Sequence, residues 1–211
     1  MSNRQLMEET RHALERNGFE VHVHATPEQA VPEILARLPA GATIGRCGSV
    51  TVERLGLWPA LADRGHPILD PYVAGFTTEQ KDAVRRQTQH ADVLLTGTNA
   101  ITTDGHLVNI DGVGNRVSAQ IFGPRQVVIV AGWNKLVAGG VPAALARIKQ
   151  VACPQNARRL NLDTPCARDL PCPPPDGCRS PGRMCNAVVI LERRPRLTPI
   201  RIHLVAAALG F

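Results

Sequence analysis

The first part of the chain alternates between helical and extended patterns of apolar residues. Positions 6, 10, 13 and 14 share one helix face, Ser2 can cap that helix, and Gly18 can end it. Residues 20–24 then predict a short strand. The sequence TPEQ at positions 26–29 resembles a capping box with proline at the first helical position, which predicts a second helix to about residue 38.

The rest of the chain continues the alternation. Strands are predicted at residues 42–45, 92–96, 126–131, 188–191 and 200–204, and helices at residues 50–55, 78–90, 115–122 and 141–152. Residues 101–110 predict a hairpin that turns at Asp104-Gly105. This order is typical of an α/β fold with a mainly parallel sheet that is covered on both faces.

Composition narrows the class of protein. The 211 residues suit one domain, residues 1–211, with a C-terminal elaboration. Only 3% of the residues are aromatic, so stacking platforms for nucleobases are scarce. The net charge of +6 favours anionic ligands, but the 24 lysines and arginines are scattered, so nucleic-acid binding is not favoured.

Neither a secretion signal nor a membrane-spanning run is recognisable, and we therefore expect a soluble, cytoplasmic protein without membrane insertion. Six cysteines in such a compartment are typical of metal or redox ligands more than of disulfides.

Three segments, at residues 45–53, 96–116 and 132–135, each follow a predicted strand. Ligand crevices in open α/β sheets lie at the carboxyl ends of the strands, so we expect these segments to converge. The candidate ligand-binding residues in them are Gly48, Ser49, Thr51, Asn99, Asn115, Arg116, Asn134 and Lys135. Ser49 and Gly48 could bind an anion at a helix start, although an ordinary N-cap is an equal alternative. Lys135 could neutralise a phosphate or carboxylate, or be an exposed loop lysine.

Residues 153–186 are rich in proline and cysteine, lack periodicity, and predict an irregular segment that a metal would order. The candidate metal ligands are Cys166, Cys172, Cys178 and Cys185. Four thiolates can hold a [4Fe–4S] cluster or a zinc ion, and the long gaps between them favour the cluster. Two disulfides or unpaired thiols are the less favoured alternative. Cys153 reads as a buried small hydrophobe that could substitute for Cys172.

Other reactive residues have ordinary interpretations. Cys47 could be a nucleophile before a helix start, but packing beside a strand end is the favoured interpretation. His22 and His24 share a strand face and are expected to be exposed edge residues. His106 lies in the hairpin and is favoured as a turn residue over a general acid or base.

The segments GSVTVERLG, TGTNAITTDGHLVNIDGVGNRVSAQIFGP, VAGWNKLV and PQNARRL, the last followed by TPC, resemble the lactate-utilisation (LUD) domain family. The resemblance covers the chain from about Gly45 onward. It implies a Rossmann-like α/β domain of the sugar-phosphate isomerase and CoA-transferase type, with its pocket at these loops. Asn99 stands near the position where the similar methylthioribose-phosphate isomerases have a catalytic aspartate, which argues against isomerase chemistry.

The same resemblance bears on the cysteines and on partners. Short members of the family are similar in having cysteines here, often with a Cys-x2-Cys, and the insertion at residues 173–175 makes Cys172 the least secure ligand. Relatives occur beside iron–sulfur proteins in lactate oxidation, so iron–sulfur or redox partner proteins are implied. A homo-oligomer is left open.

Two functions follow as hypotheses. The first is an iron–sulfur LUD-type protein that binds a small anionic metabolite and is linked to lactate or organic-acid metabolism or to electron transfer. The second is a non-catalytic sensor or assembly subunit with a structural zinc or iron–sulfur site. The sequence leaves open whether the protein is an enzyme.

Overall fold

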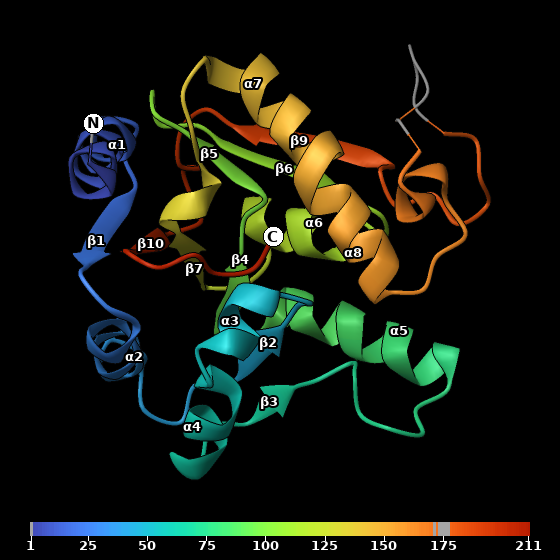
Figure 1. The fold of residues 1–211 in the computed structure, drawn as a ribbon. Helices are drawn as coiled ribbons and strands as arrows, with labels where there is room; N and C mark the ends of the chain where they lie inside the picture. The colour runs from blue at the N-terminus through green and yellow to red at the C-terminus, as the bar shows by residue number, and fades with distance from the viewer. Residues whose placement is uncertain (1, 171, 173–177) are drawn as a thin grey trace.

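A central parallel sheet organises the fold (Figure 1). The computed structural model describes residues 2–170, 172 and 178–211. The strands lie in the order β1 (Glu20–His24), β10 (Ile200–Val205), β7 (Gln126–Gly132), β4 (Val93–Gly97), β2 (Ile44–Arg46) and β3 (Ile68–Leu69). Each neighbouring pair is parallel. The predicted α/β class with a mainly parallel sheet is therefore confirmed.

A second, four-stranded sheet lies beside the first. Its order is β8 (Leu136–Val137), β5 (Ala100–Thr102), β6 (Leu107–Asp111) and β9 (Ala187–Leu191). β5 and β6 form the predicted hairpin, with Gly105 at a φ of +94° in its turn. β9 extends the hairpin with antiparallel pairing, from Leu107 opposite Leu191 to Asp111 opposite Ala187.

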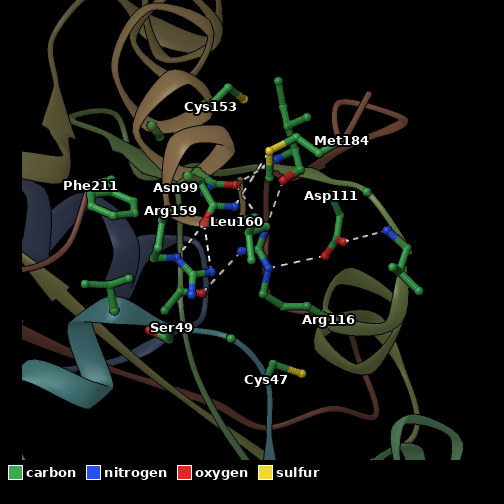
Figure 2. A pocket seen from close by; sticks show the side chains of 18 of the residues that line it. Cys47, Ser49, Asn99, Asp111, Arg116, Cys153, Arg159, Leu160, Met184 and Phe211 are labelled. Carbon is green, nitrogen blue, oxygen red and sulfur yellow. Dashed lines mark hydrogen bonds and ion pairs between the residues drawn. The ribbon is translucent and has the colours of Figure 1, made fainter. Parts of the chain in front are cut away.

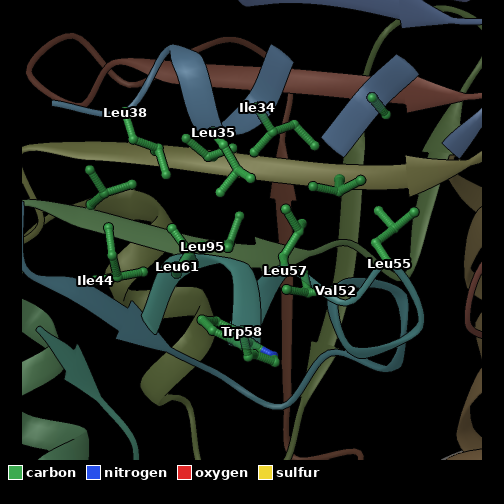
Figure 3. Packing of buried hydrophobic residues seen from close by; sticks show 14 of the residues in the cluster. Ile34, Leu35, Leu38, Ile44, Val52, Leu55, Leu57, Trp58, Leu61 and Leu95 are labelled. Atoms are coloured by element: carbon green, nitrogen blue, oxygen red, sulfur yellow. The ribbon is translucent and has the colours of Figure 1, made fainter. Parts of the chain in front are cut away.

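One face of the central sheet packs against α2 (Pro27–Ala36), α3 (Val50–Arg54) and α4 (Leu57–Asp63). Figure 3 shows Ile34 and Leu35 of α2, and Leu57 and Leu61 of α4, in one cluster on this face of the sheet. Leu61 lies close to Leu95 of β4. These side chains are buried because their apolar positions recur once per helical turn and meet alternate strand residues. Burial of each such leucine contributes about 1.5–3 kcal/mol.

The opposite face is covered by α1 (Asn3–Arg16), α6 (Asn115–Ile121) and the hairpin. Met7 and Leu14 of α1 pack with Leu94 and Ile129, which alternate with the residues that face α2. Ser2 caps α1 through a reciprocal capping box with Gln5. α5 (Thr78–Gln87) and a short 3-10 turn, η1 (Thr88–His90), continue the fold beyond β3.

A long helical rod runs across the second sheet (Figure 1). It consists of α7 (Gly140–Arg147), a π-helical turn, η3 (Ile148–Ala152), and α8 (Cys153–Arg159). The prediction that the chain is irregular from Pro154 onward is wrong for residues 154–159, because the π-helical turn η3 runs directly into α8 and Pro154 lies in the first turn of α8. The irregular part begins after Arg159, and its described residues include one short 3-10 turn, η4 (Pro165–Arg168).

One smaller prediction differs from the structure, and two short elements were not predicted. Thr26 caps α2, but Gln29 accepts the N–H of Ala25 and not that of Thr26, so the reciprocal half of the capping box is shifted by one residue. Neither α4 nor β3 was predicted. Among the described residues, no helix is both long enough and apolar enough to cross a bilayer.

The expectation that His22 and His24 are exposed is also wrong. β1 is an edge strand, yet His24 is 3% exposed and lies with its Nε2 atom 2.9 Å from Nδ1 of the fully buried His203 on β10. His22 is half-buried and stacks on the same imidazole. α2 covers this end of the strand, which places Glu33 near both β1 histidines.

Candidate functional site

The loops after β2, β4, β6 and β7 surround a cavity of about 570 Å³. They converge because parallel strands present their carboxyl ends at one edge of the sheet. Of the candidate ligand-binding residues, the cavity is lined by Gly48, Ser49, Thr51, Asn99, Asn115, Arg116 and Lys135. Asn134 is not among the lining residues. Figure 2 shows how Ser49, Asn99 and Arg116 approach the cavity from different elements.

Ser49 serves as an ordinary helix cap. Its Oγ atom accepts the N–H of Val52 at 3.4 Å, and α3 is only five residues long. Gly48 lies against the hydroxyl of Tyr72, so close that a Cβ there would stand 2.8 Å from it. These two residues therefore shape the wall of the cavity and leave little helix dipole for an anion.

A polar network beneath the cavity fixes Arg116. Its Nη1 atom donates to Oδ1 of Asn109 at 2.6 Å, and its Nη2 atom donates to Oδ1 of Asn99 at 3.0 Å. Nε of Arg116 lies 3.3 Å from a carboxylate oxygen of Asp111. Asn109 is fully buried and also donates to Gln120 at 3.1 Å. The guanidinium is thus held in one orientation by side chains of β6 and of the turn between β4 and β5.

Lys135 is buried, although an exposed loop lysine was one of its two interpretations. It is 5% exposed, and its Nζ atom donates to Oγ1 of Thr51 and to the carbonyl of Thr98, each at 2.9 Å. Burial, with Arg147 and Arg116 nearby, lowers the pKa of the Lys135 amine to about 7.

Asn134 points away from the cavity and holds the last turn of the chain. Its Oδ1 atom accepts the N–H of Leu209 at 3.0 Å, and its backbone carbonyl accepts both Nε and Nη2 of Arg147. This positions Gly210 and Phe211, which line the cavity. Asn134 therefore acts on the cavity through the chain it supports.

Sequence reasoning missed three arginines and a tyrosine that line the cavity. Arg85 comes from α5, Arg159 from α8, Arg183 from the segment before β9, and Tyr72 from the loop after β3. None follows a strand that the hydrophobic pattern had marked, and no spacing motif links them. The three arginines and Arg116 make the cavity wall strongly cationic. Asp111 is the one acidic side chain among the described lining residues.

Cys47 and His106 keep their ordinary interpretations. Cys47 lines the larger cavity, but it is 1% exposed and packs with the hydrophobic core, and burial raises the pKa of its thiol to about 12. A thiol in that state is a poor nucleophile. His106 is in the hairpin, where its backbone N–H donates to Oγ1 of Thr102, and it does not line the cavity.

The cysteines of the C-terminal segment converge on a second, smaller cavity. Its volume is about 80 Å³. The cysteines that line it are Cys153, Cys166, Cys172, Cys178 and Cys185. Lys149 and Arg183 line it too. The four candidate metal ligands are therefore brought together, and Cys153 joins them because α8 begins at that residue.

The sulfur atoms are near one another but are not arranged around a metal. Sγ of Cys153 lies 3.2 Å from Sγ of Cys185, longer than the roughly 2.0 Å of a disulfide and shorter than the roughly 3.8 Å between two thiolates on one tetrahedral zinc ion. A hydrogen bond between the two lowers the pKa of Cys185 to about 7 and raises that of Cys153. Among the described residues, no three or more His, Cys, Asp or Glu side chains form a group that could hold a metal ion.

Comparisons with known proteins give the family and the fold. The LUD domain profile matches residues 7–206. A search of curated proteins finds no match. The crystal structure of a DUF162 family protein from Deinococcus radiodurans is similar, with a TM-score of 0.55, 11% identity, and coverage of 97% of this chain and 99% of that chain.

A second solved structure, ribose 5-phosphate isomerase from Plasmodium falciparum, is similar over 55% of this chain and 53% of that chain, with 16% identity. Its TM-score of 0.36 is too low to support an inference about this protein. The likeness to the Deinococcus protein extends over nearly the whole chain but, at 11% identity, speaks for the fold alone. The profile match covers most of the sequence, including the cavity loops after β2, β4, β6 and β7, and on that ground the chain belongs to the LUD domain family.

Proposed function

We propose that this LUD-domain protein binds a small anionic metabolite in the larger cavity and holds a [4Fe–4S] cluster at the smaller one. The observation that carries the proposal is that the two cavities share Ile110, Cys153 and Arg183 as lining residues. A cluster at the cysteines would thus stand next to the bound metabolite. A metabolite site beside a cluster would suit a role in the metabolism of lactate or another organic acid, or in electron transfer to a redox partner protein.

The charge of the larger cavity supports an anionic ligand. Arg159 and Arg183 line it without a carboxylate partner among the described residues, whereas Arg85 pairs with Asp82 outside the cavity and Arg116 pairs with Asp111. Clustered cations raise the local concentration of anions, and guanidinium groups bind carboxylates and phosphates with two parallel hydrogen bonds. Asn99 and Asn115, two of the candidate ligand-binding residues, would orient the ligand.

The donor set supports a cluster. Five soft sulfur donors line a cavity with two cations, and such donors favour iron–sulfur clusters or zinc. Cys166, Cys178 and Cys185 would bind it, with Cys172 or Cys153 as the fourth ligand. Lys149 and Arg183 would offset the negative charge of the thiolates. When bound, the cluster would supply electron transfer or a Lewis-acidic iron.

Anaerobic purification tests the cluster directly. We expect a brown protein with about four iron and four acid-labile sulfide per chain, and an EPR signal after reduction. A colourless protein with one zinc per chain would show that the site holds a structural zinc and no cluster. That result would favour the alternative function, a non-catalytic sensor or assembly subunit.

Single substitutions identify the fourth ligand. We expect Cys166→Ser, Cys178→Ser and Cys185→Ser to lose iron, and Cys47→Ser, outside the small cavity, to retain it. Retention of iron in Cys172→Ser together with its loss in Cys153→Ser would assign Cys153 as the fourth ligand in place of Cys172. Full iron content in all five variants of the cavity cysteines would contradict the assigned location.

The anion site is tested with neighbouring arginines on α8. Arg159 lines the larger cavity, whereas Arg158 pairs with Asp169 outside it. We expect Arg159→Gln to weaken oxalate or phosphate binding, measured by calorimetry, about tenfold or more, because a charged hydrogen bond contributes about 1.5–3 kcal/mol. Arg158→Gln is the matched control. Equal affinities of both variants and the parent chain would count against the cationic wall.

A further inference from the structure

The hydrogen bonds of the Lys135 amine match the number that an uncharged amine can donate. A neutral amine has two N–H donors and one lone pair, whereas an ammonium has three donors. Among the described residues, Nζ donates to two acceptors, Oγ1 of Thr51 and the carbonyl of Thr98. The hydroxyl of Thr51 itself donates to the carbonyl of Leu209 at 3.1 Å, so this oxygen receives the amine proton. The two donors of a neutral amine are thereby used and its lone pair is left free.

The charges around Lys135 also favour the neutral form. The charged groups that act on it are the guanidiniums of Arg147 and Arg116, and no acidic side chain of the described residues pairs with it. Arg147 donates to the carbonyls of Asn134 and Asn99, which fixes a positive charge behind the lysine. Burial and neighbouring cations are the two conditions under which lysine becomes a nucleophile at neutral pH.

The position of Lys135 gives the amine access to the cavity. The residue is one of the lining residues, and Gly97 and Gly210 flank its Nζ atom, where a Cβ would stand 3.7 Å and 3.4 Å away. The hydroxyl groups of Ser49 and Thr51 lie beside the same two glycines, so the nitrogen belongs to the floor of the cavity and is surrounded there by glycine backbone and small polar side chains. The arginines lie on other walls of the same cavity.

We propose that Lys135 forms an imine with the carbonyl group of a small anionic metabolite, whose carboxylate or phosphate contacts the arginines. The inference rests on the anion site proposed above and narrows its ligand to an anionic carbonyl compound. The nitrogen lone pair attacks the carbonyl carbon, a C–N bond forms, and a proton moves from nitrogen to oxygen. Loss of one water molecule then gives the imine, so no oxidant or reductant is required.

Reductive trapping tests the inference. The purified protein is incubated with pyruvate or with dihydroxyacetone phosphate in the presence of cyanoborohydride, and the adduct is mapped by peptide mass spectrometry. The chain has three lysines, Lys81, Lys135 and Lys149, so the site can be assigned without ambiguity. We expect one adduct per chain at Lys135, and the more reactive of the two probes identifies the anionic group as carboxylate or phosphate.

The pH dependence and a pair of variants sharpen the test. Trapping at Lys135 should rise through about pH 7, whereas an ordinary lysine amine stays protonated there. Lys135→Met should abolish the adduct and Lys81→Met should leave it unchanged. Mapping of the parent chain decides the question even if Lys135→Met does not fold.

Oxamate and inorganic phosphate, which carry the anionic group but no reactive carbonyl, separate the two proposals. Binding of either one without an adduct from the matching carbonyl probe would overturn the imine and leave the anion site standing. Adducts spread over Lys81, Lys149 and Lys135 alike would overturn it as well. Failure of both anions and both carbonyl probes to bind would remove the anion site together with the imine.

Discussion

Asn109 is the residue on which the arrangement of the cavity depends most. Its Oδ1 atom accepts from Thr98, from the backbone of Asn99 and from Arg116, at 3.1, 3.1 and 2.6 Å. Its Nδ2 atom donates to Gln120. A single buried amide thus joins β4, β6 and α6 and sets the direction of the guanidinium.

Asn109→Ala should both destabilise the protein and weaken anion binding. Three donors and one acceptor would lose a partner in a fully buried place, so the free energy of unfolding should fall by roughly 2 kcal/mol or more, measured by urea denaturation. Calorimetry on the folded variant should show weaker oxalate binding. The exposed Gln87→Ala is the control, and an unchanged affinity in Asn109→Ala would mean that Arg116 needs no such support.

The sequence predicted the loops of the site better than the individual residues in them. Residues that directly follow strands line the cavity because the carboxyl ends of parallel strands meet at one edge of the sheet. Asn134 and Lys135 are adjacent in a 3-10 turn, yet one side chain supports the chain near Leu209 and the other lines the cavity. The contributions of Arg85 and Arg159 depend on how α5 and α8 pack, which no local pattern encodes.

Gly105 controls how two elements approach one another. It stands at positive φ in the β5–β6 turn, and a Cβ there would lie 2.7 Å from backbone atoms of Ala13 in α1. The side-chain amide of Asn17 donates to the carbonyl of Gly105 at 3.0 Å. α1 can therefore dock on the hairpin only because this turn has no side chain.

Two glycine substitutions separate this close approach from backbone strain. Gly65 has a φ of +75° and open space around its Cβ position, so Gly65→Ala should cost only the strain, about 1 kcal/mol. Gly105→Ala carries a similar strain plus the collision with α1, and should cost about 1–3 kcal/mol more. Thermal or urea unfolding measures both, and equal losses would show that α1 moves aside freely.

Elements with strong periodicity or caps were predictable, and short ones were not. α1 and the longer strands of the central sheet follow from their apolar spacing, and α5, which buries no side chain, begins at a capping box between Thr77 and Gln80. β3 has only two residues, and α4 begins after a glycine and contains a proline. The boundary of the cysteine segment was misplaced because a π-helical turn carries the rod on from α7 to Cys153. That continuation is what adds a fifth cysteine to the small cavity.

For the molecule as a whole, the buried histidines link stability to pH. Burial lowers the pKa of His203 to about 3 and also lowers that of His24, both from an ordinary value of 6.5. Below pH 6.5 the unfolded chain therefore binds protons that the folded protein does not. The stabilisation is complete above that pH and is lost as the pH falls towards 3.

The dependence of the free energy of unfolding on pH should be measurable by denaturation at several pH values. Each buried histidine should reduce the free energy of unfolding by up to about 1.4 kcal/mol per pH unit below 6.5. His203→Leu should have a shallower slope than the parent chain, and His90→Gln, at an exposed position, should not. An unchanged slope in His203→Leu would show that other groups cause the acid sensitivity.

The central position of β10 has a consequence for how the protein is made. β10 lies between β1 and β7, and the ion pair between Arg201 and Glu20 spans 181 residues. Until residues 200–205 have left the ribosome, β1 lacks its neighbour and β7 has an unpaired edge. Because such distant pairing forms slowly, the nascent chain exposes a hydrophobic strand edge throughout synthesis and would depend on chaperones during that interval.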